Sequence, residues 1–465
     1  VQNTLVQMLE RDTGIRSMTI ARFLAQWGRL LHEPGNATLL DEARSALGDH
    51  VLVLDEASMV SNEDKAKLVR LANLAEVQRL VLVGDKRQLG AVDAGKPFDL
   101  VQQVGIERAD MDVNLRGRDP VLRRAQAAAQ EGRIDDALRA LAPSTIEARG
   151  DSAIVAAEKW LSLRPADRNR TSIYASGRAL RSAVNEAVQR GLKANGELGP
   201  RSGRLTVHSR VNVTHEELRY LRTYQPSMVL SFRSRDSTQK LSKGDYTVKT
   251  IDHARRQLVL EDRKGRLRKF NPARLRPGAA DSRLSIFERK SLSIIEGDKI
   301  RWTDNDHKRG LFNADQARIV AIDTKGVLVE TSAGKELRLS RGDPMLKRMD
   351  LAYALNAHMA QGLTSDRGIA VMDSRERNLA NRQTFLVTVT RLRDGLTLIA
   401  DNAEKLGRAI KSNSGEKASA LEVMQRLKAA AAKGLSQDKD VGSGSPTSDK
   451  PELTKERVKP FEIGI

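Results

Sequence analysis

Two short apolar runs that end in acidic residues constrain the fold of this chain most strongly. The first is VLVL, residues 51–54, followed by Asp55 and Glu56, and the second is RLVLVG, residues 79–84, followed by Asp85. Apolar runs of this length, spaced by helical patterns, are typical of buried parallel strands in an α/β sheet. Because such sheets bind ligands beyond the carboxyl ends of their strands, we expect these carboxylates at a binding edge.

The remaining patterns divide the chain into two α/β domains with an insertion. Residues 1–110 alternate helical patterns with the two apolar runs, and helix and strand patterns of the α/β kind return in residues 111–204 and 346–412. Residues 205–345 hold short β-rich runs separated by Gly, Asp, Asn and Lys, a pattern of small antiparallel barrels. Residues 413–465 contain one helical pattern and then a tail whose composition predicts disorder. We find no internal repeat.

The charge of the chain indicates a polyanionic partner. Its formal net charge is +19, which favours nucleic acid first and a membrane surface second. Only 3% of the residues are aromatic, so contacts to phosphates are expected to outweigh base stacking. No run approaches the roughly 18 to 20 apolar residues of a membrane span, which predicts no membrane insertion. The absence of cysteine excludes disulfides and thiolate metal sites and fits a cytoplasmic protein.

The acidic pair after the first run suits phosphate chemistry. Asp55 can hold a hydrated Mg²⁺ while Glu56 polarises an attacking water, the Walker B arrangement of nucleotide hydrolases. A solvated pair of loop carboxylates would leave the same letters in the sequence. After the second run, Asp85 and Gln88 are suited to sensing a γ-phosphate or positioning water. A polar residue at a helix start would equally account for Gln88.

Four segments taken together are far more specific than any one of them. They follow the order and spacing of motifs II, III, V and VI of superfamily 1 helicases: LDEAS at 54–58, VGDKRQLGAVDAGKPF at 83–98, AYALNAHMAQG at 352–362 and FLVTVTRLRDGL at 385–396. The chain resembles the RecD-like, 5′-to-3′ branch of that superfamily over residues 10–405. The second segment, together with GDKIRWTDNDHKRGLFN at 297–313, is most similar to the helicase half of conjugative relaxase-helicases of the TrwC/TraI kind.

The resemblance implies an α/β fold with two RecA-like domains of the P-loop NTPase type, the second interrupted by a small SH3-like β-barrel insertion. It implies ATP and Mg²⁺ as cofactors, with Asp55 holding the ion, Glu56 activating water and Gln88 sensing the γ-phosphate. Arg116 and Arg391 match the arginines of motifs IV and VI, which would face the transferred phosphoryl group; a plain surface arginine is the alternative for Arg116. Further nucleotide contacts are implied for Asp85, Gln361 and Gly362.

The same resemblance implies a set of DNA-binding residues. Thr19 lies at the position of motif Ib, where its hydroxyl would contact a DNA phosphate, although a helix N-cap explains it nearly as well. His358 and Thr364 match motif V, in which Met359 replaces a more usual polar residue. Trp302 would stack on a base, with a tryptophan in the core of the barrel as the alternative.

One expected motif has no match. The phosphate-binding loop G-x-x-x-x-G-K-[ST] does not occur, and in AGKPF the position of its hydroxyl residue is taken by Pro97. Because the family has this loop upstream of motif Ib and the chain begins at Val1, we expect that upstream sequence, including any relaxase domain, is missing. The chain alone is therefore expected to be inactive as an ATPase.

The expected function is that of an ATP-dependent DNA helicase within a conjugative relaxase. Its expected partners are single-stranded DNA and, through the family, a type IV secretion coupling protein and relaxosome proteins. Two alternatives stay open at this stage. One is a RecD-like DNA repair helicase, and the other is a helicase-like module that binds single-stranded DNA and has lost its ATPase.

Overall fold

The structure is a computed structural model of the 465-residue chain. It describes residues 3–85, 97–111, 116–148, 150–214, 216–275, 284–356, 359, 365–376 and 379–415. The tail predicted to be disordered lies outside these residues from 416 onward. Among the helices so described, none is both long and apolar enough to cross a membrane.

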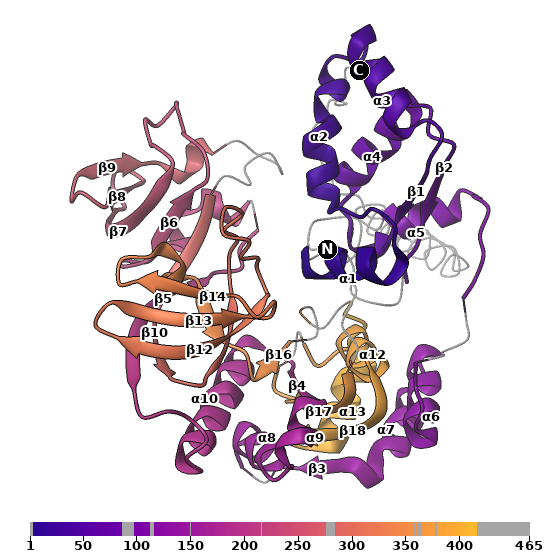
Figure 1. Ribbon diagram of the computed structural model, residues 1–465, viewed down its shortest axis with the longest axis vertical. Coiled ribbons are helices and arrows are strands. Elements are labelled where there is room, and N and C mark those ends of the chain that lie inside the picture. The colour runs from indigo at the N-terminus through magenta and orange to yellow at the C-terminus, as the bar shows by residue number, and fades with distance from the viewer. Residues whose placement is uncertain are drawn as a thin grey trace, which may run out of the picture. The chain divides into compact units, whose positions relative to one another are not determined.

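The first parallel sheet is built from the two apolar runs. Strand β1 (Val51–Leu54) pairs in parallel with β2 (Arg79–Leu82), and the helices α2 (Ile20–His32), α3 (Ala37–Leu47) and α4 (Asn62–Leu74) cover one face of it (Figure 1). Leu52 and Leu54 pack on that helical core, whereas Val51 and Val53 are 50% and 62% exposed. The prediction of a strand buried on both faces is wrong here, because within the described residues only one face is covered.

A second parallel sheet has both faces buried. Its strand order is β16 (Ala354–Leu355), β4 (Thr171–Ala175), β17 (Ser365–Met372), β18 (Leu392–Ala400) and β3 (Thr145–Glu147). Along β17, Ile369 and Val371 pack in the core of α8 (Ser152–Leu161) and α10 (Arg178–Ala194), while Ala370 and Met372 pack in the core on the opposite face. This alternation follows from the two-residue period of a strand. The α/β class predicted from the sequence is confirmed.

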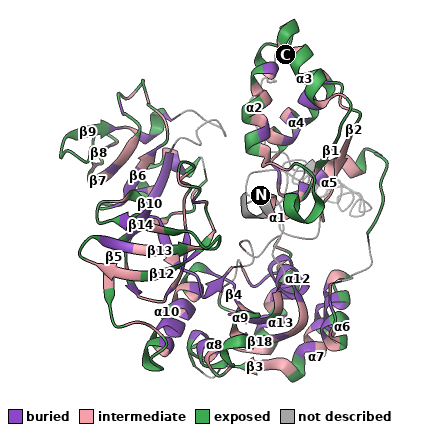
Figure 2. Ribbon diagram, in the orientation of Figure 1, coloured by how far each residue is buried: buried purple, intermediate pink, exposed green. Residues whose placement is uncertain are grey.

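Four helices cover the opposite face of the second sheet. They are α6 (Pro120–Gln130), α7 (Ile134–Leu141), α12 (Arg382–Thr390) and α13 (Ala403–Ser412). Every residue of α12 from Gln383 to Thr390 is buried, as its colour in Figure 2 shows. The predicted strand at 171–176 is β4, and the predicted helical stretch at 119–143 forms α6 and α7, separated by Gly132 at a φ of 76°.

The β-rich insertion consists of two antiparallel sheets. The first has the order β5 (Ser202–Arg210), β10 (Leu284–Ile295), β6 (Val229–Phe232), β7 (Gly244–Asp252), β8 (Gln257–Glu261) and β9 (Leu267–Phe270). The second has the order β14 (Glu336–Ser340), β13 (Gly326–Thr331), β12 (Gln316–Asp323), β11 (Lys299–Trp302) and β15 (Met349–Leu351). The antiparallel strands were predicted correctly, and the SH3-like form of the insertion stays a prediction.

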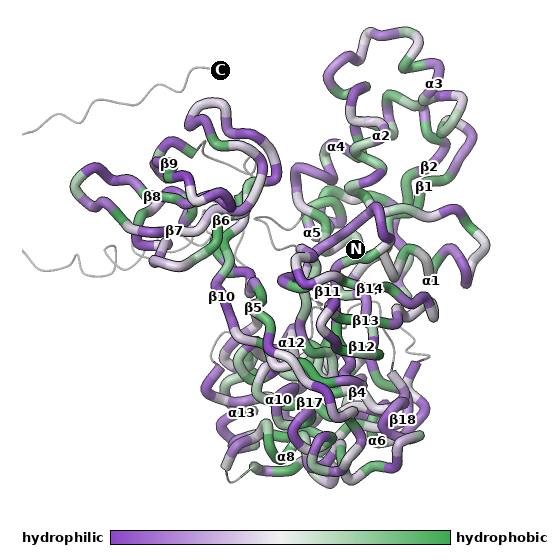
Figure 3. Tube along the Cα trace, turned by 60° about the vertical axis from the view of Figure 1, so that its left-hand side comes forward, coloured by the Kyte–Doolittle hydropathy of each residue, from purple (hydrophilic) through white to green (hydrophobic). Residues whose placement is uncertain are grey.

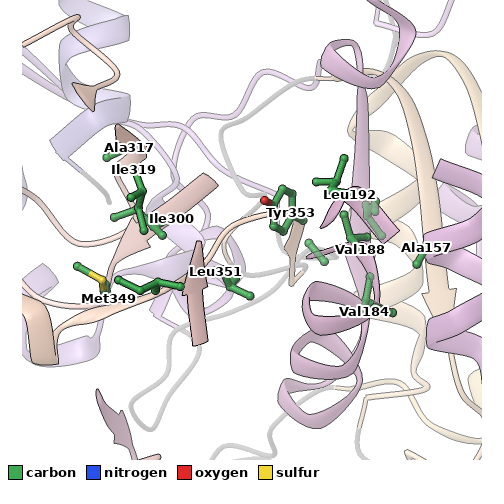
Figure 4. Packing of buried hydrophobic residues seen from close by; sticks show 14 of the residues in the cluster. Ala157, Val184, Val188, Leu192, Ile300, Ala317, Ile319, Met349, Leu351 and Tyr353 are labelled. Carbon is green, nitrogen blue, oxygen red and sulfur yellow. The ribbon is translucent and has the colours of Figure 1, made fainter. Parts of the chain in front are cut away.

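The two antiparallel sheets differ in how their cores are formed. The first sheet encloses a core of its own that includes Phe232, Leu258 and Phe270. The core of the second is continuous with the second α/β domain, because Leu351 and its neighbours in the second sheet pack in one cluster with Val188 of α10 (Figure 4). The inserted region is therefore one separate module and one sheet fused to the α/β core.

The two sheets repeat one backbone pattern. After β6, Asp236 and Leu241 form an isolated bridge with reciprocal N–H to O=C hydrogen bonds, and after β11, Asp306 and Leu311 do the same. The next strand has a register shift in both cases, and both repeats end in a short 3₁₀ helix that begins with proline, η5 (Pro272–Arg274) and η7 (Pro344–Lys347). The sequence-based conclusion that the chain has no internal repeat is thus corrected. The repeat is not visible in the sequence because the two copies share few residues.

One long ribbon joins the two cores. Strands β5 and β10 run side by side in Figure 3, and β10 pairs with β6 at its start and with β5 farther along. Leu284 and Ile286 belong to the core of the first sheet, while Ile294 belongs to the core shared with the α/β domain. Between them, Glu288 to Ser291 are not buried.

Candidate functional site

The turn after β1 places the first two candidate residues. Glu56 has a left-handed backbone conformation, with φ 50° and ψ 41°, and its N–H donates to Asp55 Oδ1 at 2.8 Å. The next N–H, of Ala57, donates to Val83 O at 2.7 Å beyond the end of β2. A left-handed conformation is uncommon for a residue other than glycine and persists only where its surroundings fix it. The predicted position of the acidic pair at the carboxyl edge of the sheet is correct.

An arginine from the second α/β domain faces this turn. Arg391, directly after α12, lies with Nη2 3.9 Å from Glu56 Oε1, and its side chain is 4% exposed against 18% for Glu56. Burial raises the pKa of Glu56, and the Arg391 charge opposes that rise. Burial likewise lowers the pKa of Arg391, which Glu56 opposes. At 3.9 Å the two charges attract each other without a direct hydrogen bond.

Arg116 lies beside Arg391 at the same helix end. Its Nη1 donates to the carbonyl of Thr390, the last residue of α12, at 3.0 Å. A guanidinium on the last carbonyls of a helix is favourable because those groups have no partner within the helix. Burial lowers the pKa of Arg116 most, the charge of Arg393 adds to this, and Glu56 opposes it. Both predicted arginines, Arg116 and Arg391, thus lie close enough to Glu56 for their charges to affect its pKa.

Two residues that support this arrangement were not singled out in the sequence. Gln126, fully buried on α6, donates from Nε2 to Val389 O and Leu392 O, both at 3.0 Å, on either side of Thr390 and Arg391. The hydroxyl of Tyr174, near the end of β4, forms a hydrogen bond of 2.8 Å with Ser365 Oγ. Burial raises the pKa of Tyr174, and the nearby charges of Arg391 and Arg116 oppose that rise. No sequence signal separates Gln126 from the other polar residues of its amphipathic helix.

The predicted DNA-binding residues have separate outcomes. Thr19 is the N-cap of α2, and its hydroxyl accepts a hydrogen bond from the Arg22 N–H at 3.2 Å. The alternative interpretation of Thr19 as a helix N-cap is therefore confirmed, and its contact with DNA stays a prediction. Trp302 is 1% exposed and packs in the core shared with the α/β domain. Its predicted stacking on a base is wrong, because the ring lies inside the core and is not accessible to a base. Outside the described residues lie Gln88, His358, Gln361, Gly362 and Thr364.

The residues present fit one Mg²⁺ ion. The described residues contain no cluster of three or more histidines and carboxylates that would hold a metal by itself. Mg²⁺ at a nucleotide does not require one, because it is bound through one or two carboxylates together with phosphate oxygens and water. Asp55 supplies such a carboxylate at the strand end, and the side chains of Glu56 and Asp85 place further negative charge nearby.

Two family models match parts of the chain. Residues 2–146, which include the acidic turn, match an AAA domain, and residues 207–294 match the DNA relaxase TraI 2B/2B-like domain. The second match covers most of the antiparallel sheet that has its own core. The boundary of the match therefore agrees with the division of the insertion into a separate module and a fused sheet.

Whole-chain comparisons extend the similarity. The multifunctional conjugation protein TraI of Escherichia coli is 24% identical over 466 residues, which cover 89% of this chain and 25% of that protein. The conjugal transfer protein TraA of Rhizobium radiobacter is 31% identical over 132 residues, 28% of this chain and 11% of that protein. This chain thus spans about a quarter of the length of TraI.

Solved structures with some likeness are helicases. Pif1 from Candida albicans is 13% identical with a TM-score of 0.34, covering 89% of this chain and 82% of that chain. Bacteroides Pif1 bound to single-stranded DNA is 13% identical with a TM-score of 0.33, covering 86% and 79%. At these scores the likeness adds nothing to the fold described above. The family matches and the similarity along 89% of the chain relate it to a region of the TraI-type relaxase-helicases.

Proposed function

We propose that this chain is the motor region of a conjugative relaxase-helicase, which hydrolyses ATP between its two α/β domains and moves 5′ to 3′ along single-stranded DNA. The observation that carries the proposal is the meeting of Glu56 from the first domain with Arg391 from the second. An acidic turn that handles water and a cationic group that faces it are the two halves of a phosphoryl-transfer site. The similarity to TraI supports the link to conjugation.

Each charged group has a role in this proposal. Asp55 would hold Mg²⁺, which neutralises charge on the phosphates when bound. Glu56 would accept a proton from the attacking water, a task for which a raised pKa is useful because a general base works best near the ambient pH. Arg391 and Arg116 would stabilise the charge that develops on the transferred phosphoryl group, an effect of about 10³ to 10⁵ in rate for an arginine finger.

The remaining predicted contacts complete the two binding sites. Asp85, Gln88, Gln361 and Gly362 are proposed to bind ATP. Thr19, His358 and Thr364 are proposed to contact single-stranded DNA, whose phosphates suit a chain of formal charge +19. The proposed setting is the cytoplasm, with a type IV secretion coupling protein and relaxosome proteins as further partners.

A second candidate is a module that holds single-stranded DNA without hydrolysing ATP. It is favoured by one observation: the 465 residues contain no match to the phosphate-binding loop. The loop supplies the backbone amides and the lysine that bind the β- and γ-phosphates, so nucleotide affinity should be very low without it. We propose that these residues alone bind DNA with little or no ATPase activity.

The decisive experiment compares the chain with its full-length gene product. ATP hydrolysis is measured with and without single-stranded DNA, and unwinding is measured on duplexes with a 5′ or a 3′ tail. The motor proposal expects DNA-stimulated hydrolysis and a preference for the 5′ tail from the full-length protein. If that protein binds DNA but never hydrolyses ATP, the non-hydrolysing module is correct. Hydrolysis with a preference for the 3′ tail would contradict the proposed polarity.

The full-length sequence also separates conjugation from repair. A relaxase domain in the same gene product would support DNA transfer, with strand nicking as its assay. A gene product that unwinds DNA and has no nicking activity would favour the alternative of a RecD-like repair helicase.

A further inference from the structure

A buried lysine lies directly behind the acidic turn. Lys65, on α4, is 3% exposed, and its Nζ donates to the carbonyl of Ala57 at 3.1 Å. The same ammonium lies 5.3 Å from the centre of the Phe98 ring, on α5 (Pro97–Gln103). Lysine is rarely buried to this degree unless it is paired with a carboxylate. Within the described part of the chain, no ion pair of Lys65 is present, so its one hydrogen bond to the turn needs an explanation.

The turn that Lys65 contacts is fixed from several sides. The Ala57 N–H donates to Val83 O, and the Met59 N–H donates to Glu56 O. The Ala57 carbonyl accepts from Lys65 Nζ at 3.1 Å and from the Val60 N–H at 3.4 Å. Gly84, two residues after the end of β2, packs against the turn, since a Cβ added there would lie 3.0 Å from Ser58 N. The N–H and the carbonyl of Ala57, the residue after Glu56, are therefore both bonded to groups outside the turn, Val83 O and Lys65 Nζ. This matters because Glu56 is held in a left-handed conformation that the chain would otherwise leave.

Stability alone does not account for an ammonium in this place. Burial lowers the pKa of Lys65 to about 8, which records the cost of keeping the charge away from water. At neutral pH the group is still protonated and can donate. A methionine of similar length would fill the same space without that cost, since flexible apolar side chains pack readily in irregular sites.

We propose that Lys65 is a positioning residue for the hydrolysis reaction: it fixes the backbone that aims Glu56, and it connects that turn to Phe98 on the neighbouring helix. The inference rests on the proposed ATPase function. Phe98 closes the segment GDKRQLGAVDAGKPF at 84–98, which contains Gln88. Lys65 thus contacts both the turn that carries Glu56 and Phe98, the last residue of the second motif segment, through a single side chain.

The test compares three variants of the full-length protein. Lys65→Met removes the donor and keeps the volume, Lys65→Arg keeps a donor, and Lys67→Met changes an exposed lysine on the same helix. We expect Lys65→Met to lower kcat for ATP by roughly 30- to 100-fold, because a displacement near 1 Å has about that effect. KM for ATP and Tm should stay near the wild-type values, Lys65→Arg should recover most of kcat, and Lys67→Met should behave as wild type.

A second measurement keeps the inference testable without hydrolysis. Amide hydrogen exchange at Ala57 and Met59 is followed in the 465-residue chain, where Lys65→Met should speed exchange at least tenfold while the rest of α4 keeps its protection. Unchanged exchange, unchanged kcat, or a loss of kcat that only follows a lower Tm would each overturn the inference. If the wild-type protein hydrolyses no ATP, the proposed function fails, and hydrogen exchange alone decides the role of Lys65.

Discussion

Two largely buried clusters in this molecule, each made of a carboxylate and one or two arginines, have very different geometries. At the first, Glu56 and Arg391 face each other across 3.9 Å without a hydrogen bond. At the second, Asp350 Oδ2 accepts from Arg181 Nη2 at 2.6 Å and from Arg301 Nη2 at 2.7 Å. The first joins the two α/β domains, and the second ties α10 to the fused antiparallel sheet.

The difference separates a structural ion pair from a proposed catalytic one. Hydrogen bonds offset part of the cost of burying the Asp350 cluster, since charge-assisted hydrogen bonds are the strong ones. No such direct bond joins Glu56 to Arg391, so the attraction between them is weaker. Burial raises the pKa of Glu56 and lowers that of Arg391, which in each case favours the neutral form. Groups arranged in this way are suited to a ligand that enters between them. Changing the first cluster should affect rate, and changing the second should affect folding.

Among the variants that compare Arg391 with the Asp350 cluster, His208 and Trp302, the largest effect is expected from Arg391→Lys in the full-length protein. The variant keeps a positive charge beside Glu56 but loses the planar guanidinium, so we expect kcat for ATP to fall about 10³-fold. The free energy of unfolding should change little, because charge at this position is retained. Steady-state hydrolysis and urea unfolding on the same preparation check both points, and a large loss of stability with normal kcat would reverse the comparison.

The next largest effect is expected from Asp350→Asn, now on folding. Its two buried arginines would lose the carboxylate that they share, and breaking a buried pair of this kind costs about 3 kcal/mol or more. Asp136→Asn is the matched control, because Asp136 also lies between two arginines, Arg133 and Arg139, but in an exposed place. That variant should lose less than about 1 kcal/mol. Equal losses in urea unfolding would show that burial is not what distinguishes these clusters.

A buried histidine gives a smaller, pH-dependent effect. Burial, aided mainly by the charge of Arg348, lowers the pKa of His208 from 6.5 to about 4 in the folded state, with further charged neighbours Asp245, Lys347 and Arg289. Because the histidine takes up its proton at a higher pH in the unfolded chain than in the folded chain, protonation favours unfolding. The free energy of unfolding therefore has its full value above about pH 6.5 and falls as the pH drops toward 4.

The lowered pKa of His208 corresponds to a loss of about 2 kcal/mol in the free energy of unfolding when the pH falls to 5. His208→Leu should remove that part of the pH dependence, as measured by urea unfolding at pH 7.5 and pH 5. The same pH dependence in the variant and the wild type would show that His208 is not the group responsible.

The smallest effect is expected from Trp302→Phe. Because the Trp302 ring lies inside the core, the affinity of the chain for single-stranded DNA should stay within about twofold, whereas a stacked base is worth about 1 to 3 kcal/mol. Fluorescence anisotropy with a labelled oligonucleotide measures this directly. A loss of affinity of tenfold or more at equal folding would restore the DNA-binding reading of Trp302.

The sequence predicted the positions of the proposed catalytic residues better than those of the residues that support them. The position of Asp55 and Glu56 followed from an apolar run that ends in acids, and the place of Arg391 from a resemblance. Gln126 could not be found in the same way, because its function lies in two backbone carbonyls more than 260 residues away in the chain. Lys65 was missed for a similar reason, since its acceptor is also a backbone carbonyl.

Local propensity also failed at one element of the site. The sequence VTVT, residues 387–390, is rich in β-branched residues that favour strands, yet it forms the end of α12. Burial on every side offsets that preference, and the hydroxyls of Thr388 and Thr390 bond back to the carbonyls of Thr384 and Leu386 within the helix. The repeat in the insertion was hidden because its two copies share a backbone pattern and few letters.

The most direct test of the account is ATP hydrolysis by Glu56→Gln in the full-length protein, in the presence of single-stranded DNA. Glutamine preserves the size of the side chain but cannot accept the proton of the attacking water. The account predicts that kcat falls by about 10² to 10⁴ while binding of nucleotide and DNA persists. Hydrolysis at the wild-type rate would contradict the assignment of Glu56 as the residue that activates water.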